Sequence, residues 1–146
     1  MRQPDVFAAL LDDVIARGFI AQFRAEGTSM LPTIRDGESI AVASLAPRDI
    51  VRGDVVLYRR DARLLAHRVV GVRTAAAGRV FDMRGDAKAA NDAPVGEDAI
   101  VGAVLSVQRN GRAVSLSGRR ARLRHHAGAF ASRVKAFVVY HPCTVR

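Results

Sequence analysis

The chain has 146 residues, a length that suits a single domain. Apolar residues make up 49% of it and charged residues 25%, which is the usual balance of a globular protein. The formal net charge of +9 indicates an anionic partner, either nucleic acid or an anionic membrane surface. The single cysteine, Cys143, excludes an intramolecular disulfide and most cysteine-rich zinc sites.

The positive charge is confined to the last third of the chain. Residues 1–98 contain 14 basic and 14 acidic side chains, whereas residues 99–146 contain 9 basic and no acidic ones. The sequence therefore predicts an electrically neutral body followed by a basic tail.

No stretch of the sequence has the length and composition of a membrane span. The longest stretches without Asp, Glu, Lys or Arg are ten residues, 99–108 and 136–145, and a spanning helix needs roughly 20 apolar residues. Acidic residues interrupt the N-terminal region, so a secretory signal peptide is not expected either. We expect a cytoplasmic protein, either free or peripheral to a membrane.

The predicted elements begin with an amphipathic helix over residues 5–17, where apolar side chains recur at spacings of three and four. The period then changes, and short segments rich in valine and isoleucine are separated by Gly, Asp and Pro. Asn110-Gly111, between the last two such segments, is a strong hairpin signal. Helical periodicity returns over residues 119–139. The segments predict seven strands, over residues 19–25, 38–44, 54–60, 63–74, 79–84, 100–108 and 112–117.

These elements predict a mainly β fold, as a partly open barrel or a set of folded sheets. We expect an N-terminal amphipathic helix over residues 1–18, a β domain over 19–118 and a basic C-terminal helix or tail over 119–146. The C-terminal helix is expected first to pack on the body and second to contact an anionic membrane. Nucleic acid is the third interpretation, because no DNA-binding motif accompanies the helix.

Five short blocks in order carry the functional signal. They read GTSMLPTIRDG (27–37), RGDVVLY (52–58), AHRVV (66–70), FDMRGDAKAAND (81–92) and IVGAV (100–104). In this order the blocks resemble the catalytic domain of the type I signal peptidase superfamily, which also includes the LexA-type self-cleaving repressors. The resemblance covers roughly residues 24–105, most of the body of the chain. It implies a folded β-sheet domain and a serine peptidase activity without a cofactor.

A histidine in the third block narrows the resemblance to one branch. His67 occupies the position of the general base, where bacterial signal peptidases and LexA-type proteins use lysine. The chain is therefore most similar to the serine–histidine branch, which includes archaeal and endoplasmic-reticulum signal peptidases. Carried over by position, Ser29 is the nucleophile, His67 the base and Asp92 the acidic partner. Asp86, the other carboxylate of the same block, is the alternative partner.

The chemistry of these residue types agrees with those roles. A serine hydroxyl becomes a nucleophile when a neighbouring base takes its proton. Histidine accepts that proton near neutral pH and returns it to the leaving amine, and a carboxylate on its other nitrogen orients the ring. Gly27 and Thr28 allow a tight turn whose backbone N–H groups meet the oxyanion. The side chain of Met30 is expected either in the substrate cleft or in the core.

The sequence also departs from the family pattern in three places. Gly27-Thr28 precedes the serine where signal peptidases usually have Ser-Gly, and Ala87 and Lys88 replace the usual asparagines. The helix predicted over residues 5–17 stands where a membrane anchor is expected. These departures leave two points open: the hydrogen-bond partners of the acidic residues, and whether the protein reaches exported precursors.

We therefore expect a serine endopeptidase that cleaves signal- or leader-like peptides from precursor proteins. A self-cleaving LexA-like regulator, or an inactive domain that binds peptides or a membrane, are the alternatives. No metal is expected, because His125 and His126 are adjacent and lack the usual spacing of metal ligands. The expected partner is a precursor protein or leader peptide, with membrane contact through residues 119–146 as an option and nucleic acid disfavoured.

Overall fold

The computed structural model of the protein describes residues 3–116, 137–138 and 143–144. The one α-helix in this part of the chain is α1 (Gln3–Ala16). The strands are β1 (Ala21–Glu26), β2 (Ser39–Ala43), β3 (Val55–Arg60), β4 (Arg63–Ala75), β5 (Gly78–Arg84), β6 (Val95–Gly96), β7 (Ile100–Arg109), β8 (Arg112–Ser115), β9 (Phe137–Val138) and β10 (Cys143–Thr144). Two short 3-10 helices lie between strands, η1 (Pro47–Asp49) and η2 (Glu97–Ala99).

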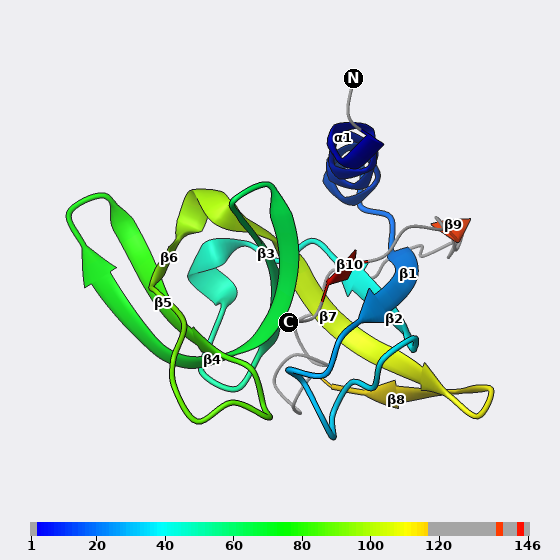
Figure 1. Ribbon diagram of the computed structural model, residues 1–146. Helices are drawn as coiled ribbons and strands as arrows, with labels where there is room; N and C mark the ends of the chain where they lie inside the picture. Colours follow the sequence, from blue (N-terminus) through cyan, green and yellow to red (C-terminus); the bar gives the residue numbers. More distant parts are fainter. Residues whose placement is uncertain (1–2, 117–136, 139–142, 145–146) are drawn as a thin grey trace.

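The strands form one open, curved sheet (Figure 1). Their order is β10-β1-β2-β7-β3-β4-β5-β6, with β8 paired to β7 and β9 paired to β1. The pairs among β1–β8 are antiparallel, whereas β9 and β10 run parallel to β1. The prediction of a mainly β protein that begins with a helix is therefore confirmed for the described residues.

The predicted strands are all present, with bounds that differ by at most two residues from the structure. The two-residue strand β6 was missed because so short a segment has no periodicity to read. The helix predicted over residues 119–139 was wrong at Phe137–Val138, which form β9 because they pair with the edge of β1. The rest of that prediction, and with it the membrane and nucleic-acid interpretations of the basic tail, lies outside the described residues. No helix in the described part is both long and apolar enough to cross a bilayer.

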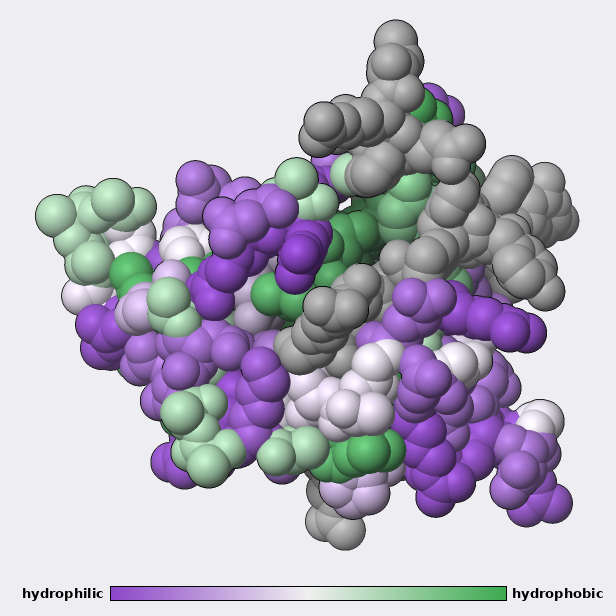
Figure 2. Space-filling view, in the orientation of Figure 1, coloured by the Kyte–Doolittle hydropathy of each residue, from purple (hydrophilic) through white to green (hydrophobic). Residues whose placement is uncertain are grey.

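Helix α1 packs one apolar face against β1 and β7. Phe7 of this face meets Phe23 of β1 edge to face, with ring centroids 5.7 Å apart. The helix ends at Ala16, and Gly18, two residues later, has a positive φ of 81°, the left-handed backbone that follows many helix C-termini. In the space-filling view, apolar surface gathers in a recess beside α1, and most of the remaining surface on this face is hydrophilic (Figure 2).

Strand β3 is buried on both faces, which explains its unbroken apolar run. Val55 and Leu57 point into a first core that also contains the buried side chains of α1 and β1. Val56 and Tyr58 point into a second core on the other face of the strand. The second core consists of Ile50, Val56, Tyr58, Val69, Phe81, Met83 and Val95.

Two tight hairpins set the register of the sheet. Asn110 and Gly111 join β7 to β8 with positive φ values of 51° and 73°, as the Asn-Gly signal predicts. Asp61 and Ala62 join β3 to β4 with φ values of 49° and 61°. The second turn aligns β3 with β4 so that Val56 lies directly opposite His67, which places His67 on the face of the second core.

Candidate active site

Three polar side chains from three separate segments form a hydrogen-bonded chain. The Ser29 Oγ lies 2.9 Å from the His67 Nε2, and the His67 Nδ1 is hydrogen-bonded to the Asp92 Oδ2. Ser29 is 6% exposed and His67 only 1%, while the Asp92 side chain is 14% exposed. The structure thus brings together the three residues that the motif blocks single out; we call Ser29, His67 and Asp92 the triad.

Ser29 lies in the loop of residues 27–38 that joins β1 to β2; we call it the Ser29 loop. Gly27 begins the loop with a φ of 101°, a backbone conformation that an L side chain would strain. Its N–H donates to the Asp36 Oδ1 at 2.7 Å, so the start and the end of the loop are tied together. The Leu31 N–H donates to the Thr28 carbonyl at 3.2 Å, which makes a turn around Ser29. This bonding holds the serine hydroxyl at a defined point beside the sheet.

Met30 is fully buried in the first core, and the structure therefore places it among core side chains rather than in an open cleft. Its carbonyl accepts a hydrogen bond from the Ile34 N–H at 2.9 Å. Leu31, the next residue, is 37% exposed. Leu31 is the large apolar side chain of the Ser29 loop that is exposed, and Pro32 beside it is exposed as well.

The hydrogen bonds of His67 assign its tautomer. Asp92 offers a carboxylate oxygen to Nδ1, so Nδ1 carries the ring proton of the neutral imidazole. Nε2 then has a lone pair directed at the Ser29 hydroxyl, which donates to it. This is the arrangement in which an imidazole acts as a general base toward a serine.

Asp92 is held in place through its own backbone and its neighbour. The Asp92 N–H donates to the Met83 carbonyl at 2.8 Å, at the end of β5. The Arg60 guanidinium donates to the carbonyl of Ala93, the next residue. The carboxylate is therefore fixed relative to β5 and β3 rather than carried on a free loop.

Sequence reasoning missed Tyr58, a fully buried residue of β3. Its hydroxyl donates to the Asp92 Oδ2 at 3.1 Å and lies 3.2 Å from the His67 Nδ1. Burial, together with the negative charge of Asp92, raises the pKa of Tyr58 well above its ordinary value, so the phenol remains a donor at physiological pH. Tyr58 lies two residues after Val56 and therefore on the same face of β3. Recognising from the sequence that this face meets His67 requires the strand register that the Asp61-Ala62 turn sets.

Asp86 does not contact His67 through any of its hydrogen bonds. Its two oxygens accept from the Arg68 Nε at 2.8 Å and the Arg68 Nη2 at 2.7 Å, and the Thr33 hydroxyl donates to Oδ2 at 2.5 Å. Burial alone would raise the pKa of Asp86, but the hydrogen bonds from Arg68 and Thr33 outweigh it and lower the pKa. Asp86 thus connects the Ser29 loop to β4, and the structure places Asp92, not Asp86, at the imidazole.

Gly85 lets the segment before Asp92 pack directly against the serine. A Cβ at this position would lie 2.6 Å from the Ser29 carbonyl oxygen and 3.1 Å from the Ser29 Cβ. The Ala87 N–H donates to the same carbonyl at 2.9 Å, and the Asp86 N–H donates to the Met30 Sδ at 3.4 Å. Glycine followed by a hydrogen-bonded turn is therefore what this close approach of two backbones requires.

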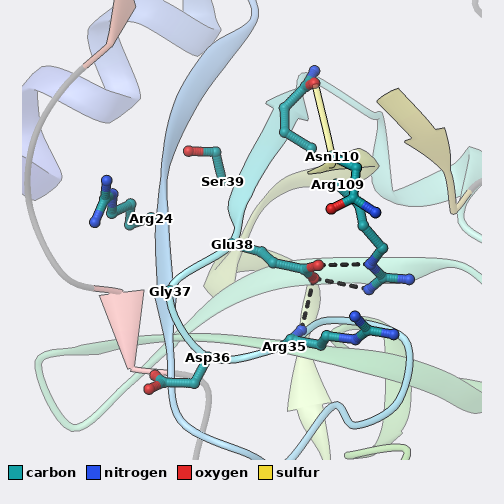
Figure 3. Close-up of a pocket in the computed structure, with 9 residues that line it drawn as sticks. Arg24, Arg35, Asp36, Gly37, Glu38, Ser39, Arg109 and Asn110 are labelled. Atoms are coloured by element: carbon teal, nitrogen blue, oxygen red, sulfur yellow. Dashed lines mark hydrogen bonds and ion pairs between the residues drawn. The ribbon is translucent and has the colours of Figure 1, made fainter. Parts of the chain in front are cut away.

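A second ion pair anchors the far end of the Ser29 loop (Figure 3). Arg109 of β7 donates two hydrogen bonds to Glu38, at 2.6 and 2.9 Å, and a third to the Thr33 carbonyl at 3.2 Å. The hydrogen bond from Arg109 holds the pKa of Glu38 below its ordinary value despite partial burial. The pair lines a polar pocket of about 380 Å³ that contains none of the triad residues. We therefore assign to the Arg109–Glu38 ion pair the role of supporting the Ser29 loop.

The described residues contain no group of three or more His, Cys, Asp or Glu side chains with the geometry of a metal site. His125 and His126 lie outside them. No protein-family model matches the chain, and no curated protein matches it. The assignment of a function therefore depends on the geometry above and on the motif blocks.

Proposed function

We propose that the protein is a serine endopeptidase in which Ser29 is the nucleophile, His67 the general base and Asp92 the acidic partner. The observation that carries the proposal is the 2.9 Å hydrogen bond from the Ser29 hydroxyl to the His67 Nε2, with Asp92 on the opposite ring nitrogen. A lone serine–histidine contact is common in proteins. A buried imidazole held between a serine and a carboxylate is the arrangement that acyl transfer needs.

The reaction follows from the positions of the protons. As the Ser29 Oγ attacks the substrate carbonyl carbon, His67 Nε2 takes the hydroxyl proton and the carbonyl oxygen becomes an oxyanion. His67 then gives that proton to the leaving amine, the C–N bond breaks, and an acyl ester remains on Ser29. A water molecule, deprotonated by His67, releases the acid and restores the serine. Asp92 stabilises the imidazolium in both halves of the reaction.

The donors for the oxyanion are the backbone N–H groups of Thr28 and Ser29. Gly27 is excluded from this role by its hydrogen bond to Asp36. In a studied serine protease, removal of one oxyanion-hole donor, a side-chain amide, costs about 2.7–4 kcal/mol of catalysis. The Ser29 loop is anchored at its start by the bond from Gly27 to Asp36 and at its end by Arg109, and oxyanion donors are most effective when they are preorganised.

For the substrate we propose signal- or leader-like peptides of precursor proteins. Support comes from the order of the motif blocks, which resembles that of the type I signal peptidase superfamily, and from a folded, mainly β sheet with a buried serine–histidine pair. An extended substrate strand would pair with backbone near the Ser29 loop, where Leu31 is exposed. Backbone pairing supplies affinity, and pockets for small side chains supply specificity.

The test is cleavage by the purified full chain of a peptide library prepared by trypsin digestion of a bacterial proteome, followed by mass spectrometry. We expect cuts at a common motif that vanish in Ser29→Ala, since that variant retains the fold but lacks the nucleophile. Equal cleavage by Ser29→Ala would refute the assignment of the nucleophile. Cleavage of the chain itself, at a rate independent of its concentration, would instead identify a self-cleaving regulator.

A further inference from the structure

Tyr58 is a buried titratable group to which the proposed reaction assigns no proton transfer. Its hydroxyl nevertheless contacts both members of the acid–base pair, at 3.1 Å from the Asp92 Oδ2 and 3.2 Å from the His67 Nδ1. The side chain is 0% exposed, so water does not compete for these contacts. A polar group in such a position has a large effect on the groups that it touches.

The protons available to this cluster permit one arrangement of donors. Asp92, as a carboxylate, only accepts, and the neutral phenol of Tyr58 has one proton to donate. That proton goes to the Asp92 Oδ2. The proton on His67 Nδ1 then points toward the same oxygen, and the Tyr58 oxygen accepts at most a share of it. Two donors thus converge on one carboxylate oxygen from two directions.

Tyr58 itself is held firmly. Its ring packs in the second core and meets the His67 ring edge to face, with centroids 6.1 Å apart. The Arg60 guanidinium lies 5.5 Å above the ring centroid, and the same guanidinium donates to the Ala93 carbonyl. Strand β3 therefore contacts the Asp92 segment at two points, once through Tyr58 and once through Arg60.

We propose that Tyr58 is a positioning residue that holds the Asp92 carboxylate against the His67 Nδ1, so that Nε2 stays directed at Ser29. The inference rests on the proposed function of the triad. In this role Tyr58 touches neither the substrate nor the reacting atoms. The hydrogen bond from its hydroxyl to the Asp92 Oδ2 keeps the carboxylate from rotating, both while the imidazole is neutral and when it becomes an imidazolium.

The test compares the wild-type chain with Tyr58→Phe, which removes only the hydroxyl. With the best-cleaved peptide of the library, we expect kcat to fall about 10-fold or more and KM to change less than about twofold, as for one lost hydrogen bond to a charged group. In proton NMR spectra, the low-field signal of the His67 Nδ1 proton, assigned by its loss in His67→Gln, should exchange with water about 10-fold faster, as expected for the same lost hydrogen bond. The matched control is Thr33→Val, which deletes the hydroxyl bonded to Asp86 and should leave that signal unchanged.

The outcomes separate the role of Tyr58 from the proposed function. A Tyr58→Phe variant with the wild-type kcat and the wild-type Nδ1 proton signal would overturn the role of Tyr58 and leave the peptidase standing. Retained cleavage by Ser29→Ala would overturn the peptidase, and the NMR comparison would still decide whether Tyr58 holds the pair. If Tyr58→Phe does not fold, the wild-type chain decides. A Tyr58 hydroxyl proton that exchanges too fast to be observed at low temperature contradicts the bond to Asp92.

Discussion

Replacing Gly85 by alanine should disable the protein through the position of its serine. The added Cβ would lie 2.6 Å from the Ser29 carbonyl oxygen, 0.8 Å short of the 3.4 Å at which ordinary contact begins. The oxygen belongs to backbone, so the Ser29 loop and the Gly85 turn must separate by most of that distance. A displacement of about 1 Å at a reacting group costs about 100-fold in rate. We expect kcat/KM to fall by about that factor.

The same change should also destabilise the fold. Overpacking costs typically about 1–3 kcal/mol, and the hydrogen bond from the Ala87 N–H to the Ser29 carbonyl is strained as well. Urea unfolding followed by circular dichroism measures this loss, and cleavage of the library peptide measures the activity. Both assays are run at a temperature where each variant is folded.

Two other glycines provide matched controls. A Cβ at Gly102 would lie 2.5 Å from the Ala43 carbonyl oxygen, so Gly102→Ala should lose similar stability without moving Ser29. Gly96 has an ordinary φ of −81°, and the group nearest to its added Cβ is the mobile end of Asp98, so Gly96→Ala should change neither property. Gly85→Ala with wild-type kcat/KM, or a loss of activity in Gly102→Ala as large as in Gly85→Ala, would refute the reasoning.

The two carboxylates near the imidazole should respond differently to replacement by asparagine. Asp92→Asn offers an amide to the His67 Nδ1 and favours the wrong tautomer, so we expect kcat to fall by about 10⁴-fold, as in the serine protease triad, with the fold retained by circular dichroism. A loss under tenfold would contradict the role of Asp92. The lowered pKa of Asp86 means that its stabilising effect is present above the ordinary carboxyl pKa of about 3.9 and is lost as pH falls through its folded pKa. Asp86→Asn should therefore lower the free energy of unfolding at pH 7 and flatten its decline below about pH 4 in urea titrations. If the free energy of unfolding of the variant declined below about pH 4 as it does in the wild-type chain, Arg68 and Thr33 would not stabilise the carboxylate.

The sheet could be predicted from local pattern because its signals are local. Short segments rich in valine and isoleucine, separated by Gly, Asp and Pro, mark the seven longer strands, and the Asn110-Gly111 turn needs only two residues that adopt positive φ. The strand β9 could not be predicted in the same way. Its helical period is a local preference, and pairing with β1 overrides it.

The candidate site likewise has a part that can be predicted from the sequence and a part that cannot. Ser29, His67 and Asp92 stand in recognisable blocks, so the residue types of a serine–histidine centre can be read from the chain itself. Which of the two carboxylates faces the imidazole cannot be read there, because Asp86 and Asp92 belong to the same short segment. The tertiary structure decides it: Arg68 and Thr33 bind Asp86, and the bond from the Asp92 N–H to Met83 directs the other carboxylate to His67.

The sequence by itself thus determined a mainly β body without net charge, the candidate pair Ser29 and His67, and two candidate carboxylates, Asp86 and Asp92. Only the tertiary structure decided the partner of His67, the contact of Tyr58 with that pair and the close approach of Gly85 to Ser29. The physical reason is that periodicity and turn chemistry depend on neighbours along the chain. Hydrogen-bond partners in a buried site depend on strand register, and here the Asp61-Ala62 turn sets the register that brings Tyr58 to His67.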